Sequence, residues 1–112
     1  ASFASFLEEE LPEGLDSENH MNAFLGKSKK GRTSLVTEAT GRLALKEGDY
    51  LMIPPHNGPA TDSNTKSELG NDKGYQLYNT QKDPAELHNL AIEKEKLLEK
   101  MKKSFTQQSA NK

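Results

Sequence analysis

Short stretches of apolar and β-branched residues recur through the middle of the chain between turn residues, a pattern typical of β-strands. They predict strands at residues 34–38, 42–46 and 50–53. In the second stretch Leu43 and Leu45 share one face, and turns at residues 39–41 and 47–49 separate the stretches. A pair of prolines ends the third stretch, because proline cannot donate a hydrogen bond to a strand ladder. The pattern therefore predicts a three-stranded meander.

A fourth strand is predicted at residues 75–79, where aromatic and aliphatic side chains are available on both faces. A strand with two usable faces usually lies in the interior of a sheet. Between the third and fourth strands, residues 56–73 are polar, contain glycine and almost lack large apolar side chains. This composition predicts a long exposed loop, of a length that is often functional or disordered.

After the fourth strand, apolar residues recur every three or four positions and predict an amphipathic helix. The residues of this stripe are Leu87, Leu90, Ala91, Lys94, Leu97, Leu98, Met101 and Phe105. Asp83, Pro84 and Glu86 have the spacing of a capping box and mark either a helix start or an isolated helical turn. Asn89 suits a left-handed cap. The closing helical region is predicted at residues 84–106, and the tail after it is expected to fray.

The N-terminal part of the chain predicts two short helical segments. Phe3, Phe6 and Leu7 have helical spacing, and we interpret residues 1–12 as the end of a longer helix and a linker, because this apolar face has no obvious partner in so short a chain. Residues 16–26 begin with cap-forming side chains and end at a glycine, which predicts a short helix or a helical turn.

These elements together predict an α+β fold. Residues 1–112 are expected to form a single domain: a four-stranded antiparallel sheet within residues 33–79, packed by the C-terminal amphipathic helix, with a short N-terminal helix. The hydrophobic content of 32% and aromatic content of 6% predict a thin core. One face of the sheet is covered by the helix, and the opposite face needs another cover.

Charge and composition exclude several classes of partner. The formal net charge is −2 with interspersed signs, which predicts no nucleic-acid partner. No apolar run approaches the roughly 20 residues that cross a bilayer, so no membrane insertion is expected. The chain has no cysteine and therefore no disulfide or thiolate site. Residues 27–32 are basic, and we weigh a solvated connector against an anion-binding segment.

The search for catalytic or metal-binding patterns identifies none. The three histidines, His20, His56 and His88, are far apart and have no metal-ligand spacing, so each is interpreted as a surface residue. Asp83 and Glu86 are better explained by the capping box than by a catalytic carboxylate pair. We therefore predict no catalytic residue and no metal ligand in this chain.

Two motifs nevertheless resemble a known family. The run LALKEGDYLMIPP, followed after the loop by YQLYNTQKDPAELHNLA, resembles the C-terminal subdomain of the type I, formylglycine-dependent sulfatases (arylsulfatases) of the alkaline-phosphatase superfamily. The matching residues are Gly48, Asp49, Tyr50, Leu77, Tyr78, Asn79, Asp83, Pro84, Glu86, Asn89, Leu90 and Ala91. The resemblance covers nearly the whole chain, and residues 1–12 look like the last helix of the family's large domain. Leu51 stands where the family commonly has lysine, so any role of that lysine is not carried over.

The resemblance implies a larger parent enzyme. The family's signature, Cys or Ser followed by x-Pro-x-Arg, is missing here, as are the residues that hold metal and sulfate. The resemblance thus implies calcium and formylglycine in the full-length parent but no cofactor in this fragment, which by itself is expected to be inactive. Its implied partners are the N-terminal sulfatase catalytic domain and a sulfated sugar or aryl sulfate. Periplasmic or extracellular location is implied by the resemblance alone.

In the family, loops of this subdomain can border the substrate pocket, which directs attention to residues 56–73 and 37–42. Arg42, His56 and Asn57 are the candidates for contacts to the sulfated substrate; the alternative is that all three are ordinary surface residues. A second hypothesis for the whole chain is a stand-alone interaction module, in which the amphipathic helix or a sheet edge binds a protein partner.

Overall fold

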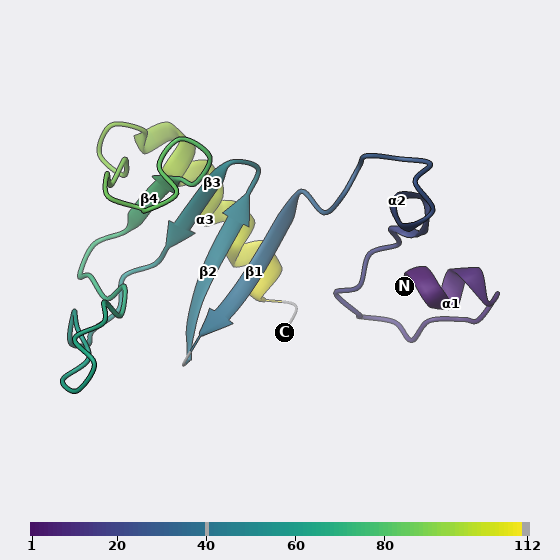
Figure 1. The fold of residues 1–112 in the computed structure, drawn as a ribbon, viewed down its shortest axis with the longest axis horizontal. Coiled ribbons are helices and arrows are strands. Elements are labelled where there is room, and N and C mark those ends of the chain that lie inside the picture. The colour runs from purple at the N-terminus through teal and green to yellow at the C-terminus, as the bar shows by residue number, and fades with distance from the viewer. Residues whose placement is uncertain (40, 111–112) are drawn as a thin grey trace. The chain divides into compact units, whose positions relative to one another are not determined.

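The chain forms two compact units in the computed structural model, which describes residues 1–39 and 41–110. The first unit is Ala1–Thr33 and the second is Ser34–Lys112. The first contains helices α1 (Ser2–Phe6) and α2 (Met21–Phe24). The second contains strands β1 (Ser34–Ala39), β2 (Arg42–Glu47), β3 (Tyr50–Ile53) and β4 (Gln76–Asn79), followed by helix α3 (Glu95–Ser109) (Figure 1).

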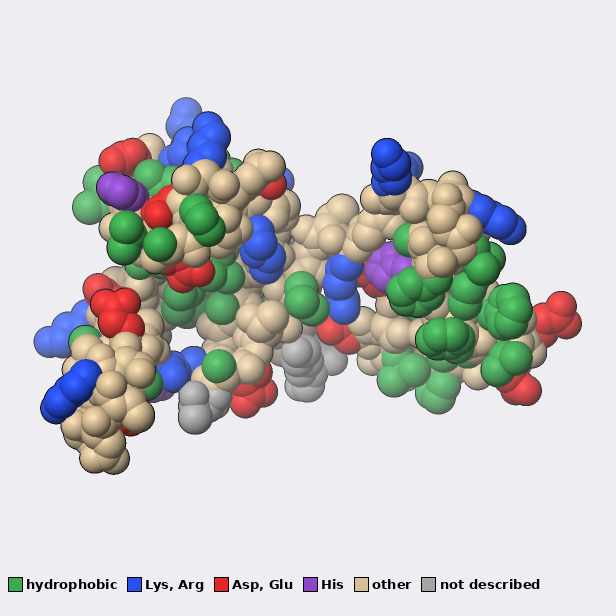
Figure 2. Space-filling view, in the orientation of Figure 1, with side chains coloured by type: hydrophobic (Ala, Val, Ile, Leu, Met, Phe, Trp, Pro, Cys, Tyr) green, Lys and Arg blue, Asp and Glu red, His purple; other side chains and the backbone are tan. Residues whose placement is uncertain are grey.

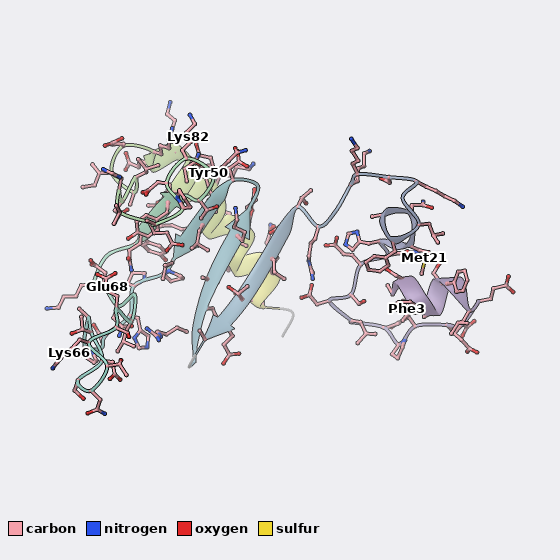
Figure 3. The ribbon with its side chains drawn as sticks, viewed as in Figure 1. Phe3, Met21, Tyr50, Lys66, Glu68 and Lys82 are labelled. Carbon is pink, nitrogen blue, oxygen red and sulfur yellow. The ribbon has the colours of Figure 1, made fainter. Side chains whose placement is uncertain are left out.

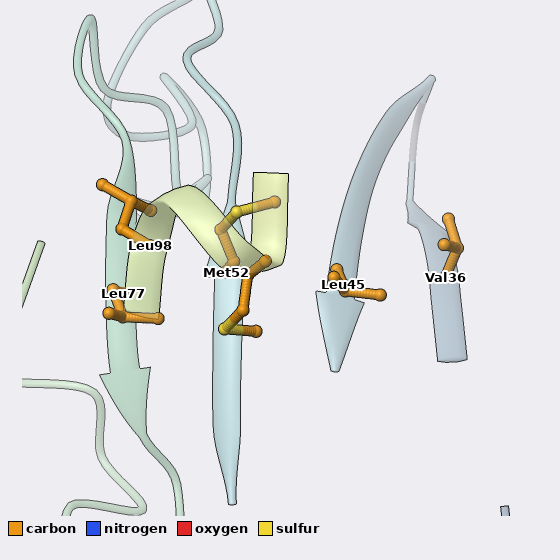
Figure 4. Close-up of a cluster of buried hydrophobic side chains, with 6 residues drawn as sticks. Val36, Leu45, Met52, Leu77 and Leu98 are labelled. Atoms are coloured by element: carbon orange, nitrogen blue, oxygen red, sulfur yellow. The ribbon is translucent and has the colours of Figure 1, made fainter. Parts of the chain in front are cut away.

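The second unit is built on a four-stranded sheet in the order β1-β2-β3-β4, with every pair antiparallel. The register aligns one apolar residue from each strand in a continuous row: Val36, Leu45, Met52 and Leu77. All of them are buried, and Figure 4 shows the four side chains with Leu98 of α3 beside Leu77. The predicted meander and fourth strand are confirmed, because the period of two places these residues on the same face.

Helix α3 closes this core. Its buried residues, Leu98 and Met101, pack on the row of four, and Leu97 and Phe105 add partly buried surface. The predicted α+β fold, with a C-terminal helix on the sheet and a short N-terminal helix, is confirmed. The helix extends to Ser109, three residues beyond the end predicted at residue 106.

The start predicted for the closing helix is wrong by about three turns, since α3 begins at Glu95 rather than near Pro84. Two features prevent helix before it. Glu86 has a φ of 55°, outside the helical region, and the Leu90 N–H donates to the Leu77 carbonyl at 2.7 Å instead of to a preceding turn. Leu87, assigned to the helical stripe, is 76% exposed.

β4 is an edge strand, so the expectation that it lies in the interior of the sheet is also wrong. It is buried along its whole length because the chain covers it from several sides. On the face opposite α3, the Tyr78 hydroxyl donates to Gln76 Oε1 at 2.8 Å, and Gln76 Nε2 donates to the Gly70 carbonyl at 2.9 Å. The loop before β4 thus covers part of the face that was expected to need an external partner.

The first unit is small and exposes most of its apolar side chains. The Phe3 and Phe24 rings stack with centroids 6.0 Å apart, and the buried Ser2 hydroxyl accepts a hydrogen bond from the His20 N–H at 2.7 Å. Arg32 binds Asp16 and lies 3.3 Å from Glu18 Oε1. Figure 2 shows green hydrophobic side chains gathered over this unit.

Both helices of the first unit are shorter than predicted. α1 ends at Phe6 and Glu8 takes a φ of 59°, so the acidic run lies outside the helix. Only Met21–Phe24 of the predicted segment 16–26 is helical, because the Asp16 carboxylate is bound to Arg32 and does not cap a helix. Of the two predicted alternatives, a short helix or a helical turn, the four residues of α2 match the shorter one.

Candidate functional site

The loop between β3 and β4, predicted as long and exposed, is an irregular hairpin. The His56 N–H donates to the Asp72 carbonyl at 2.9 Å, and the Leu69 N–H donates to the Ala60 carbonyl at 2.8 Å. An isolated bridge pairs Thr61 with Glu68. The two legs therefore run side by side away from the sheet (Figure 1).

Asp62 organises the tip of this hairpin. Its Oδ1 accepts hydrogen bonds from the backbone N–H groups of Asn64 and Thr65, both at 2.8 Å. The Thr65 backbone hydrogen bond is the main reason that the pKa of Asp62 is lowered. Lys66 lies toward this outer end of the loop, and Glu68 lies nearer the sheet (Figure 3). The tip is thus a folded turn rather than an unstructured excursion.

Arg42 fastens the base of the hairpin to the sheet. Its Nη1 donates to the Leu69 carbonyl and to Asn71 Oδ1, the latter at 2.9 Å. Asn71 Nδ2 in turn donates to the Pro59 carbonyl on the opposite leg at 2.7 Å. One side chain from β2 and one from the loop therefore hold both legs in position.

A pocket of about 410 Å³ lies at the inner end of the hairpin. Its lining residues are His56, Asn57, Gly58, Asn71, Asp72 and Lys73. Two of the predicted substrate contacts, His56 and Asn57, thus line the same pocket, while Arg42 supports it from behind through Asn71. A Cβ on Gly58 would lie 2.7 Å from Asn71 Nδ2, so a larger residue at this position would have to displace the Asn71 side chain, which donates to the Pro59 carbonyl on the opposite leg.

The chemistry of the pocket is that of hydrogen bonding rather than catalysis. Two amides, an imidazole, a carboxylate and an ammonium group line it, and the charges of Asp72 and Lys73 offset each other. Such a set suits a ligand that carries hydroxyl or amide groups. Among residues 1–39 and 41–110, no group of three or more His, Cys, Asp or Glu gathers to hold a metal ion. These residues therefore do not fit calcium, and we assign none of them to it.

Asn89 has a structural role that the sequence did not predict. Its Oδ1 accepts hydrogen bonds from the N–H groups of Leu77 and Ala91, both at 3.0 Å, and its Nδ2 donates to the Tyr75 carbonyl at 3.3 Å. The side-chain amide pairs with the free edge of β4 as a neighbouring strand would. Asn89 does not have positive φ, so the predicted left-handed cap is wrong. The one feature of the sequence that pointed to a role for Asn89 is its place in the Asn-Leu-Ala motif.

Asp83 closes the turn after β4 rather than capping a helix. Its Oδ2 accepts from the His88 N–H at 2.8 Å and lies 3.4 Å from His88 Nδ1. Asn79 precedes it with a similar turn, in which Oδ1 accepts from the Lys82 N–H at 2.9 Å. The predicted capping box is therefore wrong. The Glu86 N–H donates to the Asp83 carbonyl at 3.1 Å in an isolated turn, which is the alternative that the sequence left open.

Replacing Asp83 by alanine should lower the melting temperature at neutral pH. The His88 backbone hydrogen bond is the main cause of the lowered pKa of Asp83, so the carboxylate stabilises the folded chain. This stabilisation is complete above the ordinary pKa of 3.8 and is lost as pH falls through the lowered folded-state pKa. Thermal unfolding at a series of pH values should therefore show the two melting curves converging in acid. A difference that persists unchanged in acid, or that Glu93→Ala reproduces at an exposed carboxylate, would contradict this role.

A second hollow, of about 600 Å³, lies between α3 and the segment before it. Its charged groups already interact with each other: Lys102 Nζ lies 2.6 Å from Glu99 Oε1 and 4.3 Å from the Tyr75 ring centroid. The bond to Glu99 is the main cause of the raised pKa of Lys102. The first contact lies within α3 and the second joins α3 to the residue before β4, so both are explained as structural contacts and the hairpin pocket remains the better candidate site.

Comparisons with known proteins place these features in context. The chain matches no protein-family model. It is 40% identical over 94 residues to an N-acetylgalactosamine-6-O-sulfatase of Bacteroides thetaiotaomicron, covering 81% of this chain and 18% of that protein. A solved sulfatase structure, from work on the metabolism of multiple glycosaminoglycans by B. thetaiotaomicron, matches 98% of this chain with a TM-score of 0.84 and 34% identity.

The chain spans only 23% of that solved structure. The resemblance to a subdomain of the sulfatases, predicted from the motifs, is confirmed by these two matches. No helix in the described part of the chain has the length and apolar content that a membrane crossing requires.

Proposed function

We propose that this chain, a homologue of the sulfatases over 18% of the relative's length, is the supporting subdomain of a sulfuric ester hydrolase that acts on a sulfated amino sugar. The observation that carries the proposal is the pocket of about 410 Å³ at the base of the anchored hairpin. Its amide and imidazole groups match the hydroxyl and acetamido groups of such a sugar. The similarity to an N-acetylgalactosamine-6-O-sulfatase supports this choice over a simple aryl sulfate.

The chain by itself is proposed to be inactive. Sulfuryl transfer needs a nucleophile and fixed positive charge beside the sulfate in the transition state. In the sulfatases the nucleophile derives from a Cys/Ser-x-Pro-x-Arg signature that this sequence lacks. Formylglycine and calcium are accordingly proposed for another part of the parent polypeptide, where they supply the nucleophile and the positive charge.

The exposed apolar side chains of the first unit are proposed to face the catalytic domain of the same polypeptide. Phe3 is 70% exposed, Phe6 63% and Leu7 66%, although each is large and apolar. Phe24 is 65% exposed and extends the same surface through its ring contact with Phe3. A solvent-exposed surface of this kind is unusual for an isolated protein and is typical of an interface. The solved relative is much longer than this chain, and the proposed partner of this surface is the part of the parent polypeptide that corresponds to the remainder of that relative.

His56→Ala and Asn57→Ala test the pocket in the full-length protein that contains this chain. Each is expected to lower kcat/KM for a 6-O-sulfated N-acetylated amino sugar about tenfold, since one hydrogen bond contributes about 1–1.5 kcal/mol. Turnover of a small aryl sulfate, which leaves the sugar contacts unused, should stay within about twofold of the parent.

Lys66→Ala, at the far end of the hairpin, is the matched control. It should leave the turnover of both substrates unchanged. The proposal fails if both pocket variants turn over the sulfated sugar at the parental rate while remaining folded. A parallel loss with the aryl sulfate would instead indicate general damage to the enzyme, which also contradicts a role limited to the sugar.

The alternative, a stand-alone interaction module, draws on the same exposed apolar surface, which would then bind a separate protein. The two hypotheses differ in what precedes the chain in its gene. A Cys/Ser-x-Pro-x-Arg signature in frame upstream is expected for the sulfatase subdomain. An upstream reading frame without it would overturn the sulfatase proposal and favour the module.

A further inference from the structure

We propose that Asn57 is a site of spontaneous deamidation, which converts a neutral amide of the hairpin pocket into a carboxylate. Asn57 is followed by Gly58, and no other asparagine in the sequence is followed by glycine. Deamidation begins when the backbone nitrogen of the next residue attacks the asparagine side chain. Glycine favours this step because it has no Cβ to block the approach or to restrict the backbone.

The structure leaves this pair free to react. Asn57 and Gly58 are both exposed, in a bend of the hairpin. Within the described residues, no hydrogen bond holds the Asn57 side-chain amide or occupies the Gly58 N–H. A side chain and a backbone nitrogen without such restraints can reach the geometry that ring closure needs.

Other asparagines of the same unit are held in place. Asn71 is bonded to Arg42 and to the Pro59 carbonyl. Asn79 is buried and accepts from two backbone N–H groups, and Asn89 makes three bonds at the edge of β4. The sequence preference and the lack of restraint therefore coincide at Asn57.

The reaction uses only water and base. The Gly58 nitrogen loses its proton to hydroxide and forms a bond to Asn57 Cγ, and the bond from Cγ to the side-chain nitrogen breaks. That nitrogen takes up a proton and leaves as ammonia, which gives a five-membered imide. Water then adds to one of the two imide carbonyls and opens the ring, which leaves either aspartate or isoaspartate at position 57. No oxidant, reductant or cofactor takes part.

The product changes the charge of the pocket. Before the reaction, Asp72 and Lys73 offset each other. Afterwards a second carboxylate faces the pocket, and an anionic ligand is repelled. The isoaspartate form also lengthens one leg of the hairpin by a backbone atom next to His56, whose N–H pairs with the Asp72 carbonyl. This consequence rests on the proposed function, whereas the deamidation itself does not.

Timed incubation of the full chain at mildly acidic and mildly alkaline pH, followed by peptide mapping, tests the proposal. Conversion at Asn57, detected by its mass change and by isoaspartate labelling, should be several-fold faster than at Asn64, and faster in alkali. Asn64 is the matched control, because it is exposed in the same hairpin but is followed by Thr65. Equal rates at the two positions would overturn the proposal.

Asn57→Gln provides a second readout in the full-length parent. Its longer side chain closes the corresponding ring far more slowly, so its activity on the sulfated sugar should stay constant during incubation while that of the parent falls. If Asn57 converts but the activity of the parent does not fall, the deamidation stands and the role of the pocket in substrate binding is refuted. A parent whose activity falls with no conversion at Asn57 would refute the charge effect proposed here.

Discussion

Leu45→Ala is expected to lower the free energy of unfolding of the chain by about 2–5 kcal/mol, the range for truncating a fully buried leucine. Leu45 is 0% exposed and lies between Val36 and Met52 in the row that crosses all the strands beneath α3 (Figure 4). Removing its side chain leaves a cavity that the two neighbouring strands cannot close without breaking the register. Small domains have only about 5–15 kcal/mol of stability, so the loss is a large fraction of the total.

Denaturant unfolding followed by circular dichroism measures this effect. Leu35→Ala is the matched control, because the same truncation is made one residue from Val36 on the opposite face, where Leu35 is 39% exposed. The control should lose much less stability. Comparable losses at the two positions would mean that both faces of the sheet are equally buried, in contradiction to the described core.

Asn89→Ala is expected to destabilise the chain by about 1–2 kcal/mol and to promote self-association. The substitution removes the amide that accepts from the Leu77 N–H and donates to the Tyr75 carbonyl. The edge of β4 then presents unpaired backbone groups, to which a strand of another molecule can add. Asn89→Asp retains the acceptor but loses the donor, so its effect should be intermediate.

Denaturant unfolding and sedimentation velocity at several concentrations together test this role. Asn22→Ala is a suitable control, since Asn22 is also exposed but belongs to the first unit, whose described residues contain no strand. A variant at position 89 that remains monomeric and as stable as the control would show that the amide is not needed to close the edge.

The sheet could be predicted because its signal is local. The strands are short stretches of four to six residues, and glycine-bearing turns or a proline pair separate the first three. The burial of one residue from each strand then follows from the register. The position of β4 at the edge of the sheet could not be predicted in this way. Gly70 and Asn89, which lie outside the strand, help to bury it.

The closing helix was placed too early because a helical spacing does not by itself establish a helix. Leu87 and Leu90 fit the stripe, yet the Leu90 N–H pairs with Leu77 in β4. Tertiary hydrogen bonding overrides the local pattern here. Leu90 belongs to the Asn-Leu-Ala motif on which the resemblance to the sulfatases partly rests, so this part of the motif forms the connection between the sheet and the helix.

The candidate site could be predicted only in part. His56 and Asn57 were selected from the loop by resemblance, and the structure places both in one pocket. Asn71 was missed, since a polar loop without alternation gives no indication that its two ends pair. Arg42 was selected as a contact to substrate, but the hydrogen bonds described for it support the loop. The segment 37–42, which was also selected, includes Thr40, outside the described residues.

The anchoring of the hairpin by Arg42 also bears on how quickly and how tightly a ligand binds. Ordering a flexible side chain on binding takes about 0.5–1.5 kcal/mol from the affinity. Because Arg42 and Asn71 already hold both legs, a ligand that enters the pocket meets a loop whose conformational entropy has been lost during folding. Association should then follow a single kinetic phase without a slow loop closure.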